Sequence, residues 1–541
     1  MRYRATRAVA VSCLSLFVLA AASPAFSDDP RYPQGIYATI NISDYIATHN
    51  LRPEGDDDKF KALYNSVLKN QAISGIALEV HWDWAQPRPP PAVPNLGYID
   101  DAFARAKASN KKIQLIVTAG FNSPKWLLDS ITSCNPLFVP GEIKPARCGT
   151  VDFDYYAEKT DQDGSGHLTL PLPWNADYID KWQAFLKALE KKYGSDQTLV
   201  SITMAGPTAA SPEMIMPNNY NTCPPNTPRE QQPCKQRNGY FAEDMWNVLF
   251  QNPQNPYPTN TDAAFIDQWK NTIDFYEGHF QDITLIITPG TGTGFPSFQS
   301  GHPFMPTSGN AIYSPGCQYS DSGGSTYVNG NFATRSCDAA TTILSYFLGT
   351  VGGHRRDLMA SQTSGMTAGE ALGLGPVSTT TKGATGDVGV AGVRYLSWYS
   401  GFPSSGQRGI AGGAQFDFEF SGKTQQEQQR EGCWLGQQNC RINPAQAAYN
   451  VLKSFFYGTA GATAFGGPTA ADDGKVYPTP RFLQVYNQDV LHAQKPTSCA
   501  LTIVDPVTQA TFKASAQDLL DAAQATLLGQ NVTYPPPHKG C

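Results

Sequence analysis

Residues 411–422 read AGGAQFDFEFSG, and within them residues 415–420 alternate polar and aromatic side chains. A two-residue period is the pattern of a β-strand, so Asp417 and Glu419 are expected to share one face. The other face of the strand is aromatic: Phe416, Phe418 and Phe420. Carboxylates on such a strand are costly to bury. They belong either to a solvated edge or to a functional site.

Seven further stretches have the composition of strands, most of them continuous apolar runs typical of buried parallel strands. The eight predicted strands span residues 34–42, 73–80, 112–119, 199–204, 283–288, 371–379, 411–420 and 460–465. Helical periodicity is found in residues 57–70, 98–110, 176–193, 261–280, 339–351, 444–458 and 481–491. This βα alternation predicts a (β/α)8 barrel of the TIM type, with an open doubly wound sheet as the alternative.

The first 27 residues have the pattern of a secretion signal rather than of folded structure. Arg2, Arg4 and Arg7 precede an apolar run at residues 8–22, which is too short for a permanent bilayer anchor. No later stretch is long and apolar enough to span a membrane. We therefore expect a secreted or periplasmic protein with a barrel in residues 28–495 and a tail in residues 496–541 packed on it. A signal anchor that stays attached is the alternative.

The charge of the chain argues against nucleic acid as a partner. The formal net charge is −6, and removing the three leader arginines makes it −6 − 3 = −9. No Lys/Arg stripe interleaved with aromatic residues is present, which nucleic-acid binding would favour.

The cysteines fall into local pairs. Eleven are present, and ten remain once Cys13 leaves with the leader. The neighbouring pairs are Cys134/Cys148, Cys223/Cys234, Cys317/Cys337, Cys433/Cys440 and Cys499/Cys541. In an exported chain this pattern predicts disulfides. Long Pro-, Gly- and Asn-rich inserts at residues 135–174, 217–257 and 292–335 follow predicted strands, so disulfide-tied loops are expected on the C-terminal face of the barrel.

Two glutamates complete a familiar arrangement. Glu213 follows the fourth predicted strand and Glu419 ends the seventh, while the turn HWDWAQP at residues 81–87 follows the second. This layout resembles the barrel-fold retaining glycoside hydrolases. The resemblance implies Glu213 as acid/base, Glu419 as nucleophile and an oligo- or polysaccharide as substrate. One departure is clear: the group usually has Asn before the acid/base Glu, whereas Pro212 stands here, and Glu213 lies seven positions past Gly206.

Sugars bind to flat apolar side chains flanked by hydrogen-bonding groups. The predicted substrate contacts near strand ends are His81, Trp82, Trp84, Asn122, Trp126, Trp398 and Asp417. For each an ordinary structural role stays open. The tryptophans could be core or rim aromatics, His81 a satisfied rim histidine and Asn122 a helix cap. Asp417 could be hydrogen-bonded beneath the site.

Other chemistries are disfavoured. No GxSxG motif is present, and eight histidines occur without HxH or HExxH spacing, so no metal and no cofactor are predicted. Glu370 precedes the predicted strand 371–379, which is the wrong end for catalysis. A barrel that binds carbohydrate without catalysis is the second hypothesis.

Overall fold

A computed structural model describes, in the main, residues 31–43, 58–156, 166–219, 221–224, 233–252, 261–288, 356–362, 413–416, 481–494, 501–504 and 510–530. These residues form a closed barrel of parallel strands in the order β1-β12-β11-β10-β7-β6-β3-β2. The strands are β1 (Gly35–Asn41), β2 (Gly75–His81), β3 (Lys112–Thr118), β6 (Leu199–Thr203), β7 (Thr284–Ile287), β10 (Arg356–Gln362), β11 (Gly413–Phe416) and β12 (Phe482–Tyr486). Each barrel strand pairs with the barrel strands before and after it in the chain, which confirms the predicted α/β barrel.

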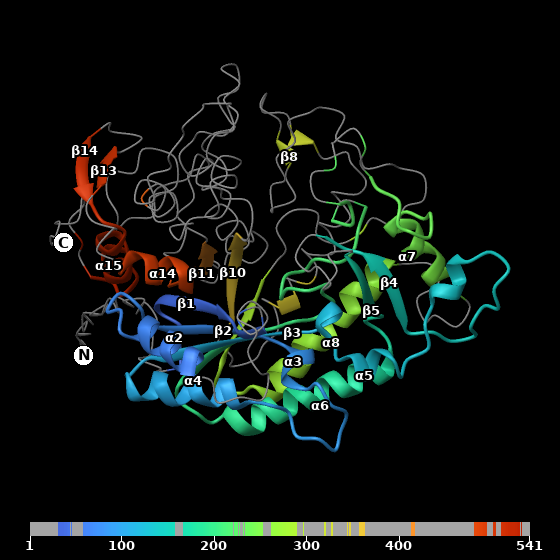
Figure 1. The fold of residues 1–541 in the computed structure, drawn as a ribbon, viewed down its shortest axis with the longest axis horizontal. Helices are drawn as coiled ribbons and strands as arrows, with labels where there is room; N and C mark the ends of the chain where they lie inside the picture. The colour runs from blue at the N-terminus through green and yellow to red at the C-terminus, as the bar shows by residue number, and fades with distance from the viewer. Residues whose placement is uncertain are drawn as a thin grey trace, which may run out of the picture. The chain divides into compact units, whose positions relative to one another are not determined.

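Helices between the strands cover the barrel (Figure 1). They are α2 (Asp58–Leu68), α4 (Gly97–Ala108), α6 (Ala176–Tyr193), α8 (Thr261–His279) and α14 (Asn487–Ala493). These helices bury apolar stripes, and on α6 the stripe includes Trp182, Phe185 and Leu189. Helix α2 contacts α4, and α6 contacts α8. No helix within the described ranges is both long and apolar enough to span a bilayer.

Two inserts add structure at the C-terminal ends of β3 and β6. The first contains α5 (Lys125–Leu128) and an antiparallel hairpin of β4 (Thr150–Asp154) and β5 (His167–Pro171). The second contains α7 (Ala242–Gln251). Disulfides Cys134–Cys148 and Cys223–Cys234 close loops in these inserts, as predicted. The other six paired cysteines lie outside the described residues. After β7 comes a short antiparallel pair, β8 (Tyr319–Ser320) and β9 (Thr326–Tyr327).

Two barrel strands lie elsewhere than predicted. The sixth is β10, whose sequence RDLMASQ starts with two charged residues and lacks an apolar run. The eighth is β12, in the first half of the predicted helix 481–491, and only its second half is helical, as α14. Residues 371–379 and 460–465 fall outside the described part of the chain. Glu370 therefore follows the sixth strand in the chain instead of preceding it.

Two glutamines contact each other inside the barrel. The side chain of Gln484 on β12 is fully buried and donates to Gln114 Oε1 of β3 at 2.7 Å. These two strands are not neighbours in the sheet, so both side chains point into the barrel.

The C-terminal segment contacts the start of β1. It contains β13 (Leu501–Val504), β14 (Thr511–Ala514) and α15 (Ala516–Leu527). The sequence of residues 512–529 also has a helical pattern, but the helix is shorter, because its first residues form β14. Helix α15 begins with a capping box between Ser515 and Asp518. Gln524 accepts from Ile36 N at 2.7 Å and donates to Ser74 Oγ at 2.8 Å, which joins α15 to the N-terminal ends of β1 and β2.

Candidate functional site

The interior of the barrel changes from apolar to polar along its axis. One buried apolar cluster, which we call the floor, contains Tyr37, Ala77, Ile116, Val200, Ile286 and Phe482. Side chains alternate along a strand, so positions two and four residues further on point into the barrel at its C-terminal end. On β1, β2 and β3 and just beyond β7 these positions are polar, and we call them the mouth: Thr39, Asn41, Glu79, His81, Thr118 and Thr288. In barrels of this fold the C-terminal end carries the site.

Glu213 lies at this mouth although it is far from β6 in the chain. Thr203 of β6 pairs with Ile286 of β7, so continued pairing would place residue 205 beside Thr288. Glu213 takes that place, because it forms a parallel bridge with Thr288 and Met214 N donates to Thr288 O at 3.2 Å. Residues 205–212 are an excursion from the sheet. Glu213 therefore lies at the level where the barrel strands end, although it is seven residues past Gly206 in the chain.

The carboxylate of Glu213 is buried, with 1% of the residue exposed. Ser211 Oγ accepts from Glu213 N at 3.3 Å and lies 3.4 Å from Glu213 Oε2, to which the hydroxyl donates. Glu213 therefore does not lie on the surface of the protein.

The excursion before Glu213 is fixed to the end of β3. Ala209 O accepts from Phe121 N at 2.6 Å, and Ala210 O accepts from the Asn122 side chain at 2.6 Å. Gly120 has a positive φ of 64°, and a Cβ there would lie 2.1 Å from Ala209 O. Only glycine allows this approach. Asn122 is thus found at the site, where its amide nitrogen holds the Glu213 loop and also donates to Thr118 Oγ1 at 3.0 Å.

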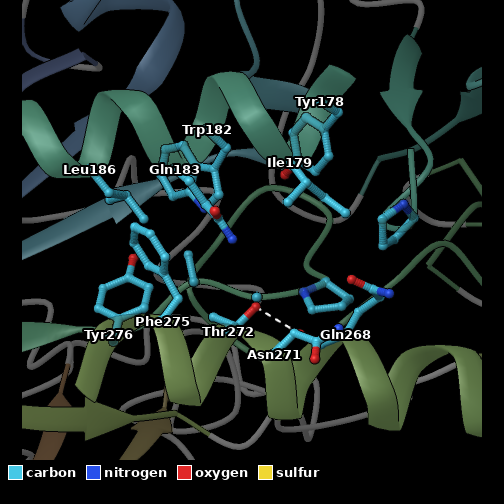
Figure 2. A pocket seen from close by; sticks show the side chains of 14 residues that line it. Tyr178, Ile179, Trp182, Gln183, Leu186, Gln268, Asn271, Thr272, Phe275 and Tyr276 are labelled. Atoms are coloured by element: carbon cyan, nitrogen blue, oxygen red, sulfur yellow. Dashed lines mark hydrogen bonds between the residues drawn. The ribbon is translucent and has the colours of Figure 1, made fainter. Parts of the chain in front are cut away.

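Helix α8 packs against the first residues of the excursion. Gly206 packs against the indole of Trp269 on α8, where a Cβ would approach to 2.7 Å. Figure 2 shows a crevice between α6 and α8, with Tyr178 and Trp182 on one side and Tyr276 on the other. Its volume of about 40 Å³ suits water rather than a sugar. Burial raises the pKa of Tyr178 and Tyr276 well above the usual tyrosine value.

The described tryptophans that are predicted to contact substrate are of two kinds. Trp82 is fully buried, donates to Gln86 Oε1 at 3.0 Å and packs on Trp182 with ring centroids 5.1 Å apart. It is a core aromatic and supports the turn. Trp84 and Trp126 are only partly buried, and Trp126 Nε1 donates to Gln86 O at 2.9 Å. These two retain indole surface that a ligand could contact.

His81 is held at the mouth by β1 and the residues that follow it. Its backbone N donates to Ser43 Oγ at 3.1 Å, and its Nε2 lies 3.4 Å from Asn41 Nδ2. The amide nitrogen of Asn41 can only donate, so Nε2 accepts in this arrangement. The His81 ring is half-buried and lies where a hydroxyl group could reach it.

Sequence reasoning missed Asn41 and Glu79. The two residues are register partners on β1 and β2, and both are half-buried among buried neighbours. The signal was present, because each is a polar residue near the end of an apolar strand, GIYATIN and GIALEVH. Glu79 adds a second acidic side chain to the interior face of the described barrel strands near the mouth.

The remaining predicted site residues, Asp417, Glu419 and Trp398, lie outside the described residues. Strand β11 ends at Phe416, and its Gln415 is the register partner of Gln484, whose side chain points inward. Asp417 and Glu419 follow this strand directly in the chain. Among the residues that the structure describes, no three His, Cys, Asp or Glu side chains group closely enough to hold a metal ion.

Comparison with known proteins identifies no family for this chain. No family model matches it, and no curated protein matches. The solved structures that resemble it include several glycoside hydrolases. The catalytic domain of a beta-amylase from Paenibacillus polymyxa has a TM-score of 0.40 and 9% identity, covering 85% of this chain and 94% of that one. A beta-glycosidase has a TM-score of 0.41 and 11% identity, covering 94% and 100%.

A beta-galactosidase from Marinomonas ef1 has a TM-score of 0.38 and 10% identity; the match covers 92% of this chain but only 61% of that protein. Likeness at this level assigns no residue and no substrate to this chain. The barrel and the placement of Glu213 are the observations on which a function has to rest.

Proposed function

We propose that this chain is an exported glycoside hydrolase that cleaves O-glycosidic bonds of an oligo- or polysaccharide by a retaining double displacement. Glu213 is the acid/base and Glu419 the nucleophile. The observation that carries the proposal is the position of Glu213 at the mouth of a closed barrel, where it forms a parallel bridge with Thr288 just beyond β7. Glu419 is included in the proposal because of its place in the sequence, three residues after β11.

The proposed reaction uses the two carboxyl groups in opposite protonation states. Glu419 attacks the anomeric carbon as a carboxylate while Glu213 gives its proton to the departing glycosidic oxygen, which leaves a covalent glycosyl-enzyme. Glu213 then takes a proton from water as that water attacks the anomeric carbon, and the sugar leaves with its configuration retained. This route needs the two carboxyl groups about 5–5.5 Å apart.

Binding of the sugar is assigned to the half-buried groups of the mouth. Asn41, His81 and Glu79 offer an amide, an imidazole and a carboxylate to hydroxyl groups, which is the mixed donor and acceptor set that a sugar requires. Trp84 and Trp126 offer apolar indole surface beside them. Export is supported by the leader pattern and by the two disulfides.

A barrel that binds carbohydrate without cleaving it is the second candidate. It is favoured by the 1% exposure of Glu213, since an acid catalyst has to reach the glycosidic oxygen. Release of reducing sugar by the purified protein separates the two candidates. Binding to glycans with no product would favour the second.

The proposal is tested by incubating the mature protein with aryl glycosides and soluble polysaccharides, followed by NMR of the first anomer formed. We expect hydrolysis with retained configuration, and essentially none by Glu419→Gln. Glu370→Gln is the matched comparison, because Glu370 also follows a barrel strand in the chain. Inverted product would contradict the double displacement. Full activity of Glu419→Gln would remove this residue as nucleophile.

A further inference from the structure

A larger cavity, of about 360 Å³, lies apart from the mouth residues and the Glu213 loop. It is bounded by the insert after β3, the first turn of α6 and the end of α7. Both inserts leave C-terminal ends of barrel strands, so the cavity belongs to the same side of the barrel as the mouth. Its polar and aromatic lining includes Thr132, Arg147, Trp174, Asn175, Asp177 and Asn252.

The walls of this cavity are held by covalent and hydrogen bonds. The Cys134–Cys148 disulfide joins two segments of the insert beside it. Gly149 N donates to Thr132 O at 2.8 Å, and Leu172 N donates to Gly149 O at 2.8 Å. Asn175 caps α6 by accepting from Tyr178 N at 3.0 Å. A cavity fixed in this way loses little conformational entropy when a ligand binds.

Trp174 contributes an aromatic wall. Its ring packs on Phe250 with centroids 4.9 Å apart and edge-on to Trp246 at 6.2 Å, so the indole is oriented by α7. The residue is only partly buried, and it lines the cavity. Figure 1 shows α7 beside the β4–β5 hairpin, where Phe153 and Trp246 pack with centroids 5.2 Å apart.

The charges and amides of the lining indicate the class of ligand. Arg147 and Asp177 are exposed and opposite in sign, so the cavity favours neither an anion nor a cation. Asn175 and Asn252 carry amides, which can donate and accept. An indole wall, two amides and one charge of each sign suit a neutral polyhydroxylated ring. The volume of the cavity lies in the range of about 300–1,000 Å³ that is usual for small-ligand sites.

We propose that this cavity is a second carbohydrate site, which binds a neutral glycan segment away from Glu213. The ligand class rests on the proposed function, because a glycosidase that acts on polymers meets such segments. Holding a polymer at a second point raises its effective concentration at the mouth. The site therefore matters for polysaccharides and leaves small substrates unaffected.

The test uses the full mature protein carrying Glu213→Gln, so that bound glycan is not degraded. Binding of soluble starch, galactan and β-glucan is measured by affinity electrophoresis, with and without the added pair Arg147→Ala and Asn252→Ala. Lys125→Ala is the matched control, since Lys125 is an exposed cation of the same insert, paired with Asp129 at 2.7 Å outside the cavity. All three residues lie outside the barrel strands and are exposed or half-exposed, so the barrel is expected to stay folded in both variants.

We expect the Arg147/Asn252 variant to bind the recognised polysaccharide at least about tenfold more weakly, and the Lys125 control to bind it normally. In the otherwise wild-type protein, the same pair should lower turnover of the polysaccharide but not of a small aryl glycoside. Unchanged binding by the pair variant overturns the proposal, as does a lack of binding to all three polysaccharides. If the wild-type protein hydrolyses glycans but the Arg147/Asn252 variant binds them normally, only the second site is excluded. If this variant binds more weakly but the wild-type protein hydrolyses no glycan, only the proposed function is excluded.

Discussion

The floor and the mouth of this barrel are built from the same strands but have opposite chemistry. On β1 the floor residue Tyr37 is buried in an apolar cluster, and two periods of the alternation later Asn41 contacts His81. On β2 the floor residue Ala77 precedes Glu79 and His81. Each of these strands thus supplies apolar packing at its start and polar groups at its end. We therefore expect variants at the floor to change stability and variants at the mouth to change activity.

The largest effect on stability is expected at the floor. Phe482→Ala removes a fully buried ring from the interior cluster and should lower the free energy of unfolding by about 3–5 kcal/mol. Chemical denaturation measures this. Ile143→Ala is the control, because Ile143 is 93% exposed and its loss should be nearly neutral. A small effect of Phe482→Ala would mean that the floor does not hold the barrel together.

The next largest effect is expected at Gly120, whose backbone contacts the loop that carries Glu213. Gly120→Ala would place a Cβ 2.1 Å from Ala209 O at a positive φ, so the loop carrying Glu213 has to move. We expect about 1–3 kcal/mol of destabilisation and a larger relative loss of turnover. Gly278→Ala is the control, since a Cβ there meets nothing within 4 Å. Normal turnover by Gly120→Ala would show that the position of this loop is not needed for catalysis.

A polar mouth residue should affect activity more than stability. Asn41→Ala removes the amide beside His81 Nε2, and we expect kcat/KM to fall about tenfold, which corresponds to about 1.4 kcal/mol. The unfolding midpoint should stay close to that of the wild type. Asn65→Ala on exposed α2 surface serves for comparison. Equal kinetics for the two variants would exclude Asn41 from substrate binding.

The smallest effect concerns alkaline pH. Burial raises the pKa of Tyr37 above the usual tyrosine value of 10.0, so the unfolded chain loses this proton at lower pH than the folded protein. Stability from Tyr37 is fully present below about pH 10 and falls as pH rises through the folded pKa, by up to about 1.4 kcal/mol per pH unit. Denaturation at pH 9 and pH 11 measures the slope. Tyr37→Phe should reduce it, and an unchanged slope would contradict this origin.

The difference between floor and mouth also explains how much of the fold can be predicted from the sequence. The first five strands are predictable because they are mostly apolar, such as KIQLIVT and TLII, although β3 also carries the inward-pointing Gln114. Strand β12 escapes prediction because FLQVY is short and leads directly into α14, so the pattern of residues 481–491 predicts a single helix. Strand β10 escapes prediction because two charged residues start it and no apolar run follows.

The sequence predicts Glu213 as a residue that follows strand four, but not its place at the strand-end level. That placement depends on hydrogen bonds between segments far apart in sequence, from Phe121 N to Ala209 O and from Met214 N to Thr288 O. No local pattern encodes such contacts. Asn41 and Glu79 differ, because a polar residue near the end of each apolar strand is visible in the sequence.

The most direct test of the central claim, that Glu213 is the acid/base, is the dependence of Glu213→Gln hydrolysis on the leaving group. The variant is compared with wild type on aryl glycosides whose phenols range from strongly to weakly acidic. An acidic phenol leaves without a proton, so Glu213→Gln should still form the glycosyl-enzyme from it. Activity on the least acidic phenols should fall by about 10²–10⁴-fold. A loss of equal size across the series would contradict the acid/base role of Glu213.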